Sequence, residues 1–168
     1  LNPVGKMDGY SLPVSAFDGL ADGQFPLGAA AYEKRGVAVT VPHWDETKCI
    51  QCNNCAYVCP HATIRPYALT EEEAAAAPAG TRLVDIKAGK GKGKYKYTMA
   101  VSPLDCMGCG VCVGVCPTKA ITMVPQEQEL AEQDVFNYMV SKVSEKKDMQ
   151  DNTVKGSQFR KPLLEFSG

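Results

Sequence analysis

The stretch CIQCNNCAYVCP at residues 49–60 recurs as CMGCGVCVGVCP at residues 106–117. Both runs have the spacing C-x2-C-x2-C-x3-C-P, and they contain all eight cysteines of the 168-residue chain. This spacing is typical of loops that bind a cubane 4Fe–4S cluster through cysteine thiolates. The offset of 57 residues (106 − 49) also makes the two runs an internal repeat. The sequence therefore predicts two 4Fe–4S clusters that exchange electrons.

The ligand sets of the two clusters are expected to cross between the runs. In two-cluster proteins with this spacing, three cysteines of one run bind one cluster and the fourth binds the other cluster. The predicted ligands are Cys49, Cys52, Cys55 and Cys116 for the first cluster, and Cys106, Cys109, Cys112 and Cys59 for the second.

The residues between the ligands differ between the two runs. Gly108 and Gly110 let backbone N–H groups approach the second cluster closely, because glycine has no Cβ. Asn53 and Asn54 stand at or next to the equivalent places in the first run. Hydrogen bonds and solvent access tune cluster potentials, so we expect two unequal potentials. Tyr57, inside the first run, is expected to shield a cluster from water.

Two other uses of the cysteines remain as alternatives, both in an interaction module without electron transfer. A disulfide framework needs an oxidising compartment, yet the sequence has no signal peptide. Structural zinc usually takes two separated C-x2-C pairs, which leaves the third cysteine of each run unexplained. His43 and His61 are not expected to be ligands, because eight cysteines already complete two clusters.

Composition limits the possible partners and location. The formal net charge of −1 gives no basic field for nucleic acid, and no apolar stretch approaches the roughly 20 residues that span a membrane. Thiolate ligands indicate a reducing, cytoplasmic setting. Because the chain starts at Leu1 without methionine and ends just after an apolar patch, we expect it to be part of a larger protein.

The expected fold is α+β, with a two-cluster bacterial ferredoxin-like core at residues 42–125. An inserted helix-plus-hairpin is expected at about 67–101, opened by a capping box at Thr70–Glu73. Residues 1–41 form an N-terminal extension that packs on the core or on a parent enzyme. Apolar residues at helical spacing predict one helix over 126–150, and residues 151–168 form an exit segment.

Beyond the cysteines, the flanks resemble one family, the pyruvate:ferredoxin (flavodoxin) oxidoreductases. The resemblance covers nearly the whole chain. It rests on Phe25-Pro-Leu-Gly28, Tyr32-Glu-Lys-Arg-Gly36, Val41-Pro42, Cys49-Ile-Gln-Cys52-Asn53, Cys59-Pro-His-Ala-Thr-Ile-Arg-Pro66, Cys106-Met-Gly-Cys109-Gly110, Gly156-Ser-Gln-Phe159, Pro162-Leu163 and Glu165-Phe-Ser-Gly168.

The resemblance implies a role in pyruvate oxidation. That family decarboxylates pyruvate with coenzyme A and thiamine diphosphate, and passes electrons through three 4Fe–4S clusters to ferredoxin or flavodoxin. This chain would hold two of the clusters, while thiamine diphosphate, Mg and the third cluster would belong to remaining domains after the exit segment. The chain alone would then not oxidise pyruvate, and no catalytic residue is expected in it. A ferredoxin-type subunit of another 2-oxoacid oxidoreductase or of a hydrogenase is the nearest alternative.

Overall fold

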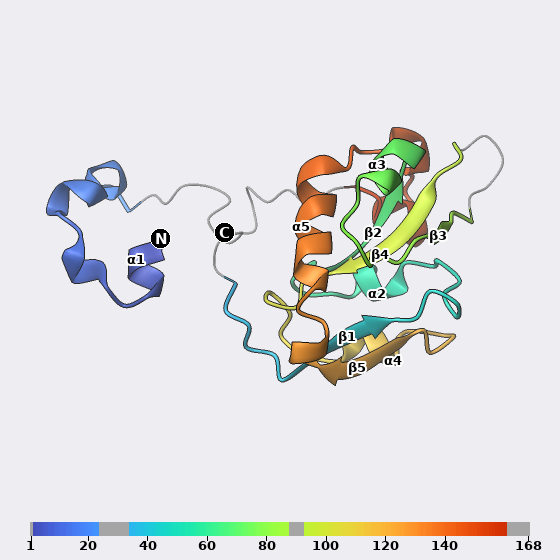
Figure 1. Ribbon diagram of the computed structural model, residues 1–168, viewed down its shortest axis with the longest axis horizontal. Coiled ribbons are helices and arrows are strands. Elements are labelled where there is room, and N and C mark those ends of the chain that lie inside the picture. Colours follow the sequence, from blue (N-terminus) through green and yellow to red (C-terminus); the bar gives the residue numbers. More distant parts are fainter. Residues whose placement is uncertain (1, 24–33, 88–92, 161–168) are drawn as a thin grey trace. The chain divides into compact units, whose positions relative to one another are not determined.

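The computed structural model describes residues 2–23, 34–87 and 93–160 (Figure 1). The chain divides into two compact units, of which the larger spans Gly36–Lys161 and the smaller contains Leu1–Arg35. The smaller unit has a short helix α1 (Asn2–Gly5) and 3-10 helices at Gly9–Ser11 and Val14–Leu20. None of the residues in these three elements is buried. Residues 161–168 of the expected exit segment lie outside the described residues.

The larger unit repeats one strand–helix–strand arrangement at the 57-residue offset of the cysteine runs. Each half places a cysteine run between two strands, with a single-turn helix inside the run. The first half contains β1 (Thr40–Trp44), α2 (Asn54–Tyr57) and β2 (Ile64–Leu69). The second half contains β4 (Lys96–Val101), α4 (Val111–Gly114) and β5 (Ile121–Pro125).

The strands of the two halves pair across the repeat. β1 pairs antiparallel with β5, and β2 pairs antiparallel with β4. The registers match as well, because Trp44 faces Ile121 in one pair and Ile64 faces Val101 in the other. The short strand β3 (Val84–Asp85) joins the free edge of β4, which gives a three-stranded sheet of order β2-β4-β3. Neither half therefore forms a sheet of its own.

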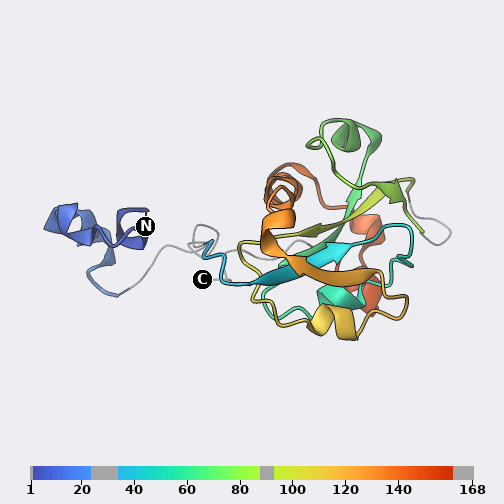
Figure 2. The same cartoon turned by 60° about the horizontal axis from the view of Figure 1, so that its bottom comes forward.

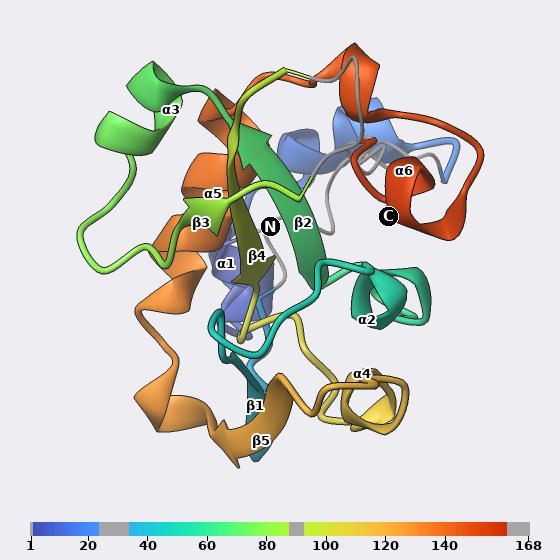
Figure 3. The ribbon, with the colours of Figure 1, turned by 90° about the vertical axis from the view of Figure 1, so that its right-hand side faces the viewer.

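The three-stranded sheet (Figures 2 and 3) separates two apolar clusters of side chains. Alternate side chains of a strand point to opposite faces. On one face, Tyr67, Leu69 and Ala100 pack against helix α5 (Glu132–Lys142). On the other face, the side chains pack toward the cysteine runs, and this cluster includes Ile64, Ala68, Tyr97, Met99 and Val101 with Cys55 and Cys112. Figure 3 shows α5 on one side of the sheet and α2 and α4 on the other.

The segment between the repeats is shorter than predicted. β2 and β4 are paired core strands, but the expected insertion at 67–101 takes in the end of β2 and the whole of β4. Only residues 70–95 lie between the two halves. They contain helix α3 (Glu71–Ala75), which Thr70 and Glu73 open with a capping box, and strand β3.

The prediction of one helix over 126–150 was wrong, because the helix in this range is shorter. The structure has a 3-10 helix at Gln126–Gln128, α5 at Glu132–Lys142 and another 3-10 helix at Lys147–Met149. The chain leaves the helix at Val143, which is extended, with ψ at 128°. The next amide, of Ser144, donates to the carboxylate of Glu73 at 2.8 Å instead of to a helical carbonyl. A contact with a distant residue therefore ends the helix.

Two other boundaries also differ from expectation. The predicted boundary after residue 41 falls inside β1. This strand begins at Thr40 and pairs with β5, so it belongs to the core. The predicted exit segment contains a short helix, α6 (Val154–Ser157), which Thr153 caps by accepting a hydrogen bond from the Gly156 amide at 3.1 Å. In the part of the chain that the structure describes, no helix is both long and apolar enough to cross a membrane.

Candidate metal centre

The two cysteine runs adopt the same backbone path. Two residues in each run lie in the left-handed region, Gln51 and Asn53 in the first run (φ 58° and 63°) and Gly108 and Gly110 in the second (φ 68° and 71°). The second of these begins the single-turn helix that carries the third cysteine, Cys55 in α2 or Cys112 in α4. Side chains other than glycine are uncommon in this conformation, although asparagine tolerates it.

Backbone amides donate hydrogen bonds to the first and last sulfur of each run. In the first run, Gln51 N lies 3.3 Å from Cys49 Sγ and Thr63 N lies 3.4 Å from Cys59 Sγ. The repeat makes the same two bonds in the second run. There, Gly108 N lies 3.4 Å from Cys106 Sγ and Ala120 N lies 3.2 Å from Cys116 Sγ. Such donors stabilise negative charge on sulfur, so both runs are built to hold thiolates.

Four cysteines from both runs line one pocket. It has an empty volume of about 370 Å³, part of which is open to solvent, and it contains Cys59 together with Cys106, Cys109 and Cys112. The Cys59 thiolate is also among the charges that raise the pKa values of Cys106 and Cys112, after burial itself. The structure thus brings Cys59 of the first run to the three leading cysteines of the second.

The leading cysteines of the first run gather under aromatic and apolar side chains. Cys55 is buried, and its Sγ lies 4.0 Å from Met99 Sδ. Burial raises the pKa of Cys55 to about 12, and the nearby charges of Cys49 and Cys52 act in the same direction. The same three thiolates, after burial, raise the pKa of Tyr97, which lies next to them. Tyr97 also contacts the Trp44 ring edge-on, with 5.9 Å between centroids.

Burial disfavours ionisation of the inner thiols of both sets. Burial, followed by the charges of Cys106 and Cys59, raises the pKa of Cys112 to about 11. At Cys116 burial acts against ionisation, but hydrogen bonds from the Ala120 amide and from Thr118 outweigh it and lower the pKa. Metal binding to cysteine requires the thiolate, so loading of these sites releases protons.

The two sites differ in exposure. Cys109 is the exposed member of the eight cysteines, whereas its counterpart Cys52 is half-buried; the neighbouring Met107 and Ile50 are exposed in both runs. Tyr57, which is expected to shield a cluster, is 60% exposed. The fully buried Tyr97 lies beside the first run instead, and its Oη donates to Asn53 Oδ1 at 2.8 Å. Tyr97 stands in the alternating run Tyr95, Tyr97, Met99 and Val101, which is typical of a half-buried strand, but nothing in the sequence indicates that it lies beside the first run.

The two histidines lie in different surroundings. His61 is exposed and lines the rim of the four-cysteine pocket. His43 Nδ1 lies 2.6 Å from the buried Glu129 carboxylate, away from the sulfurs. All eight cysteines are free thiols. Among the described residues, no group of three or more His, Cys, Asp or Glu side chains is arranged around the position of a single metal ion.

Comparisons with protein families find two matches along the chain. Residues 48–120 match the 4Fe-4S dicluster domain, which covers both cysteine runs. Residues 1–38 match a family described only as a domain of unknown function, which coincides closely with the smaller unit.

Curated relatives match the chain over all or nearly all of its length. The pyruvate-flavodoxin oxidoreductase of Enterobacter agglomerans is 51% identical over 170 residues, covering 100% of this chain and 14% of the relative. The pyruvate:ferredoxin oxidoreductase of Moorella thermoacetica is 48% identical over 171 residues, with the same shares. The pyruvate dehydrogenase [NADP(+)] of Cryptosporidium parvum is 45% identical over 168 residues, covering 99% of this chain and 9% of the relative.

The chain thus spans about a seventh of the length of the first two relatives. The pocket lined by cysteines of both runs, the repeated strand pairing and the family match agree with one another. This chain has a mixed helix-and-strand fold with a 4Fe-4S dicluster domain of the ferredoxin type, and over its length it is homologous to a segment of the pyruvate-flavodoxin and pyruvate:ferredoxin oxidoreductases.

Proposed function

We propose that this chain relays electrons between two 4Fe–4S clusters within a pyruvate oxidoreductase. The first cluster would be held by Cys49, Cys52, Cys55 and Cys116, and the second by Cys106, Cys109, Cys112 and Cys59. The observation that carries the proposal is the pocket in which Cys59 joins the three leading cysteines of the other run. For Cys116 the support is the symmetry of the fold. The Ala120 amide donates a hydrogen bond to Cys116 Sγ, just as the Thr63 amide donates one to Cys59 Sγ.

The residues of the chain fit such clusters in three ways. Four sulfurs surround one pocket, backbone amides point at sulfurs, and an apolar cluster of side chains excludes water from the inner side of both runs. A bound 4Fe–4S cluster accepts and returns one electron at a time. The paired strands hold the two runs rigidly, which keeps the reorganisation on electron transfer small. Because the second site opens to the surface at Cys109, we place the exit of electrons there.

The rest of the proposal concerns the larger protein. Thiamine diphosphate, Mg, a third 4Fe–4S cluster and pyruvate decarboxylation belong, on this view, to remaining domains that follow the exit segment at 151–168. The acceptor is ferredoxin or flavodoxin, as the names of the relatives suggest for those proteins. The smaller unit would pack on the parent enzyme, since its described helices bury no residue. The thiol ligands suit the cytoplasm, and neither nucleic acid nor a membrane is expected as a partner.

The fold proposal is a two-cluster bacterial ferredoxin-like core with an inserted helix and hairpin. The core consists of the two halves that repeat at 57 residues, and α3 and β3 form the insertion between them. Residues 70–95, between β2 and β4, would then be an addition to the repeated core.

The test separates ligand sets by pairs of substitutions in the chain prepared anaerobically. The wild-type chain should contain about eight irons and eight sulfides, as two cubane clusters require. The pair Cys59→Ala with Cys109→Ala removes two ligands of one proposed cluster, so the other cluster should remain intact and reducible. The control pair Cys116→Ala with Cys109→Ala removes one ligand from each cluster and should damage both. Electron paramagnetic resonance of the reduced samples counts the surviving clusters.

Two outcomes would contradict the proposal. If both pairs damage the two clusters equally, the crossed ligand sets are wrong. Zinc in place of iron in the wild-type chain, or oxidised thiols without metal, would establish an interaction module in place of an electron relay.

A further inference from the structure

The left-handed positions of the two runs are occupied by different kinds of residue. The second run has glycine at both, whereas the first has Gln51 and Asn53. A residue with a Cβ costs about 1–2 kcal/mol in this conformation, which asparagine offsets in part and glutamine does not. Both carboxamide side chains are nearly fully buried, at 1% exposure. Such cost and burial point to a role for the side chains themselves.

Gln51 holds the segment that follows β3. Its Nε2 donates to the carbonyl oxygen of Asp85 at 2.9 Å, and its Oε1 accepts from the amide of Lys87 at 2.7 Å. The carboxamide thus takes the place of a backbone peptide group and extends the pairing of β3 toward the first cysteine run.

Asn53 holds the segment around α6 in a similar way. Its Nδ2 donates to the carbonyl oxygen of Lys155 at 2.8 Å, while its Oδ1 accepts from Tyr97 Oη at 2.8 Å. One side chain therefore joins the ligand loop, the core strand β4 and the C-terminal helix α6.

The two held segments are also joined to each other. Lys155 Nζ donates to the carbonyl oxygen of Lys87 at 2.7 Å, and Lys87 Nζ donates to the carbonyl oxygen of Cys49 at 3.0 Å. Residues 85–87 and 153–157 together form what we call the collar of the first run. Because the collar comes from segments outside the repeat, it has no counterpart from the other half of the core.

The second run has no carboxamide side chain at the two equivalent positions, Gly108 and Gly110, and their surroundings differ from those of Gln51 and Asn53. A Cβ at Gly108 would lie 3.1 Å from the carbonyl oxygen of Thr40, so a side chain there would be tightly packed against backbone. At Gly110 a Cβ would meet no atom within 4 Å. The adjoining Cys109 and Met107 are exposed.

We propose that Gln51 and Asn53 are positioning residues that close the collar over the first ligand loop and hold the potential of the first cluster below that of the second. The inference rests on the proposed electron relay. Reduction adds a negative charge to a cluster, and a site shut off from water stabilises that charge less. The amide-to-sulfur bonds are the same in both runs and cancel in the comparison. The Lys87 ammonium opposes the effect, but it is exposed and screened by solvent.

The experiment replaces each carboxamide by the glycine of the other run. Gln51→Gly, Asn53→Gly and the double variant relieve backbone strain, so the loop path should persist while the collar is released. The matched control is Asn54→Val, which installs the second-run counterpart one residue along and removes a carboxamide that is not among those bonded to the collar. Each chain is prepared anaerobically, assayed for iron and titrated potentiometrically under electron paramagnetic resonance. The first cluster is recognised as the one that Cys109→Ala leaves intact.

We expect an upward shift in the potential of the first cluster in each glycine variant, larger in the double variant. The second cluster and the control should keep the wild-type potentials. Equal shifts of both clusters, a downward shift or no shift would overturn the proposal. Loss of iron from the first site would also overturn it, because the carboxamides would then serve assembly and not the potential. Failure of the electron relay itself is distinct, since the wild-type chain would then lack eight irons.

Discussion

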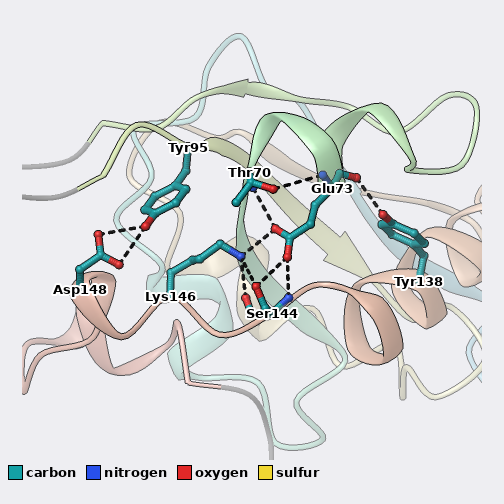
Figure 4. Close-up of polar contacts among 7 residues, drawn as sticks. All are labelled: Thr70, Glu73, Tyr95, Tyr138, Ser144, Lys146 and Asp148. Atoms are coloured by element: carbon teal, nitrogen blue, oxygen red, sulfur yellow. Dashed lines mark hydrogen bonds and ion pairs between the residues drawn. The ribbon is translucent and has the colours of Figure 1, made fainter.

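Lys146→Met should release helix α3 from the segment that follows α5. Lys146 Nζ donates to Glu73 Oε2 at 2.7 Å, and to the carbonyl oxygen and Oγ of Ser144 at 2.9 and 2.7 Å (Figure 4). The Lys146 and Glu73 side chains are only 7% and 16% exposed. Glu73 also accepts from the amides of Thr70 and Ser144. The substitution leaves a largely buried carboxylate with one charged partner fewer.

The lowered pKa of Glu73 sets the size of the effect. Burial acts against ionisation, but the hydrogen bonds from Lys146, Ser144 and Thr70 outweigh it and lower the pKa to about 2. Compared with an ordinary glutamate, this corresponds to about 3 kcal/mol, which solvent screening and the surviving donors reduce to about 2 kcal/mol for Lys146 alone. Because the folded-state pKa is lowered, this stability is present above about pH 4.5 and is lost as the pH falls toward about 2.

Hydrogen exchange measures the loss locally and leaves the clusters intact. A change of about 2 kcal/mol corresponds to roughly 30-fold faster exchange of the Ser144 amide, which donates to Glu73 Oε1. Deuterium uptake by a peptide covering 138–146 is followed by mass spectrometry at neutral pH under anaerobic conditions. Lys142→Met is the matched control, because Lys142 is an exposed lysine in the last turn of α5. Acceleration below about threefold in Lys146→Met, or equal acceleration in the control, would refute the reasoning.

Two further substitutions test the ligand loop and a buried charge cluster. Gly108→Ala adds a Cβ 3.1 Å from the carbonyl oxygen of Thr40 at a residue with φ of +68°, so the iron content after anaerobic preparation should fall. Gly114→Ala is the control, because its Cβ meets no atom within 4 Å, and this variant should bind the full amount of iron. Equal iron content in the two variants would contradict the close approach at Gly108. Arg82→Met removes the guanidinium that lies 3.3 Å from the Glu132 carboxylate. Burial raises the pKa of Glu132, and Arg82 acts in the opposite direction, so its loss leaves a buried carboxylate without this partner. The variant should be destabilised by about 2–4 kcal/mol, and the loss should grow as the pH rises from about 5 to 8. The temperature at which half of the cluster absorbance is lost, measured at the two pH values, reports this destabilisation. A loss of stability that does not depend on pH would contradict the role of Glu132.

The repeat in the cysteine runs predicted much of the local structure, because it depends on spacing along the chain. The two runs lie in halves of the same strand–helix–strand build, which follow the 57-residue offset that the cysteines have in the sequence. The capping box at Thr70 also depends only on residues three apart. Local chemistry of this kind can be inferred from the sequence alone.

Contacts between distant residues were not predictable in the same way. Glu73 and Lys146 lie 73 residues apart, and their ion pair helps to end the expected long helix at Lys142. Likewise, the sequence did not predict the hydrogen-bond partners of Gln51 and Tyr97, because these partners come from segments that only the fold brings together. The pattern of apolar residues predicted burial, but it could not say which distant polar groups meet.

The crossed strand pairing has a consequence for synthesis of the chain on the ribosome. β1 leaves the ribosome early, but its partner β5 begins only at Ile121. A nascent chain that ends before Lys96 lacks the partners of both strands of its first half, and it has one run of cysteines without the other. Completion of both strand pairs must therefore wait until β5 has emerged, as expected for a topology dominated by distant contacts. Until then, the thiols of the first run lack the fold that buries Cys55.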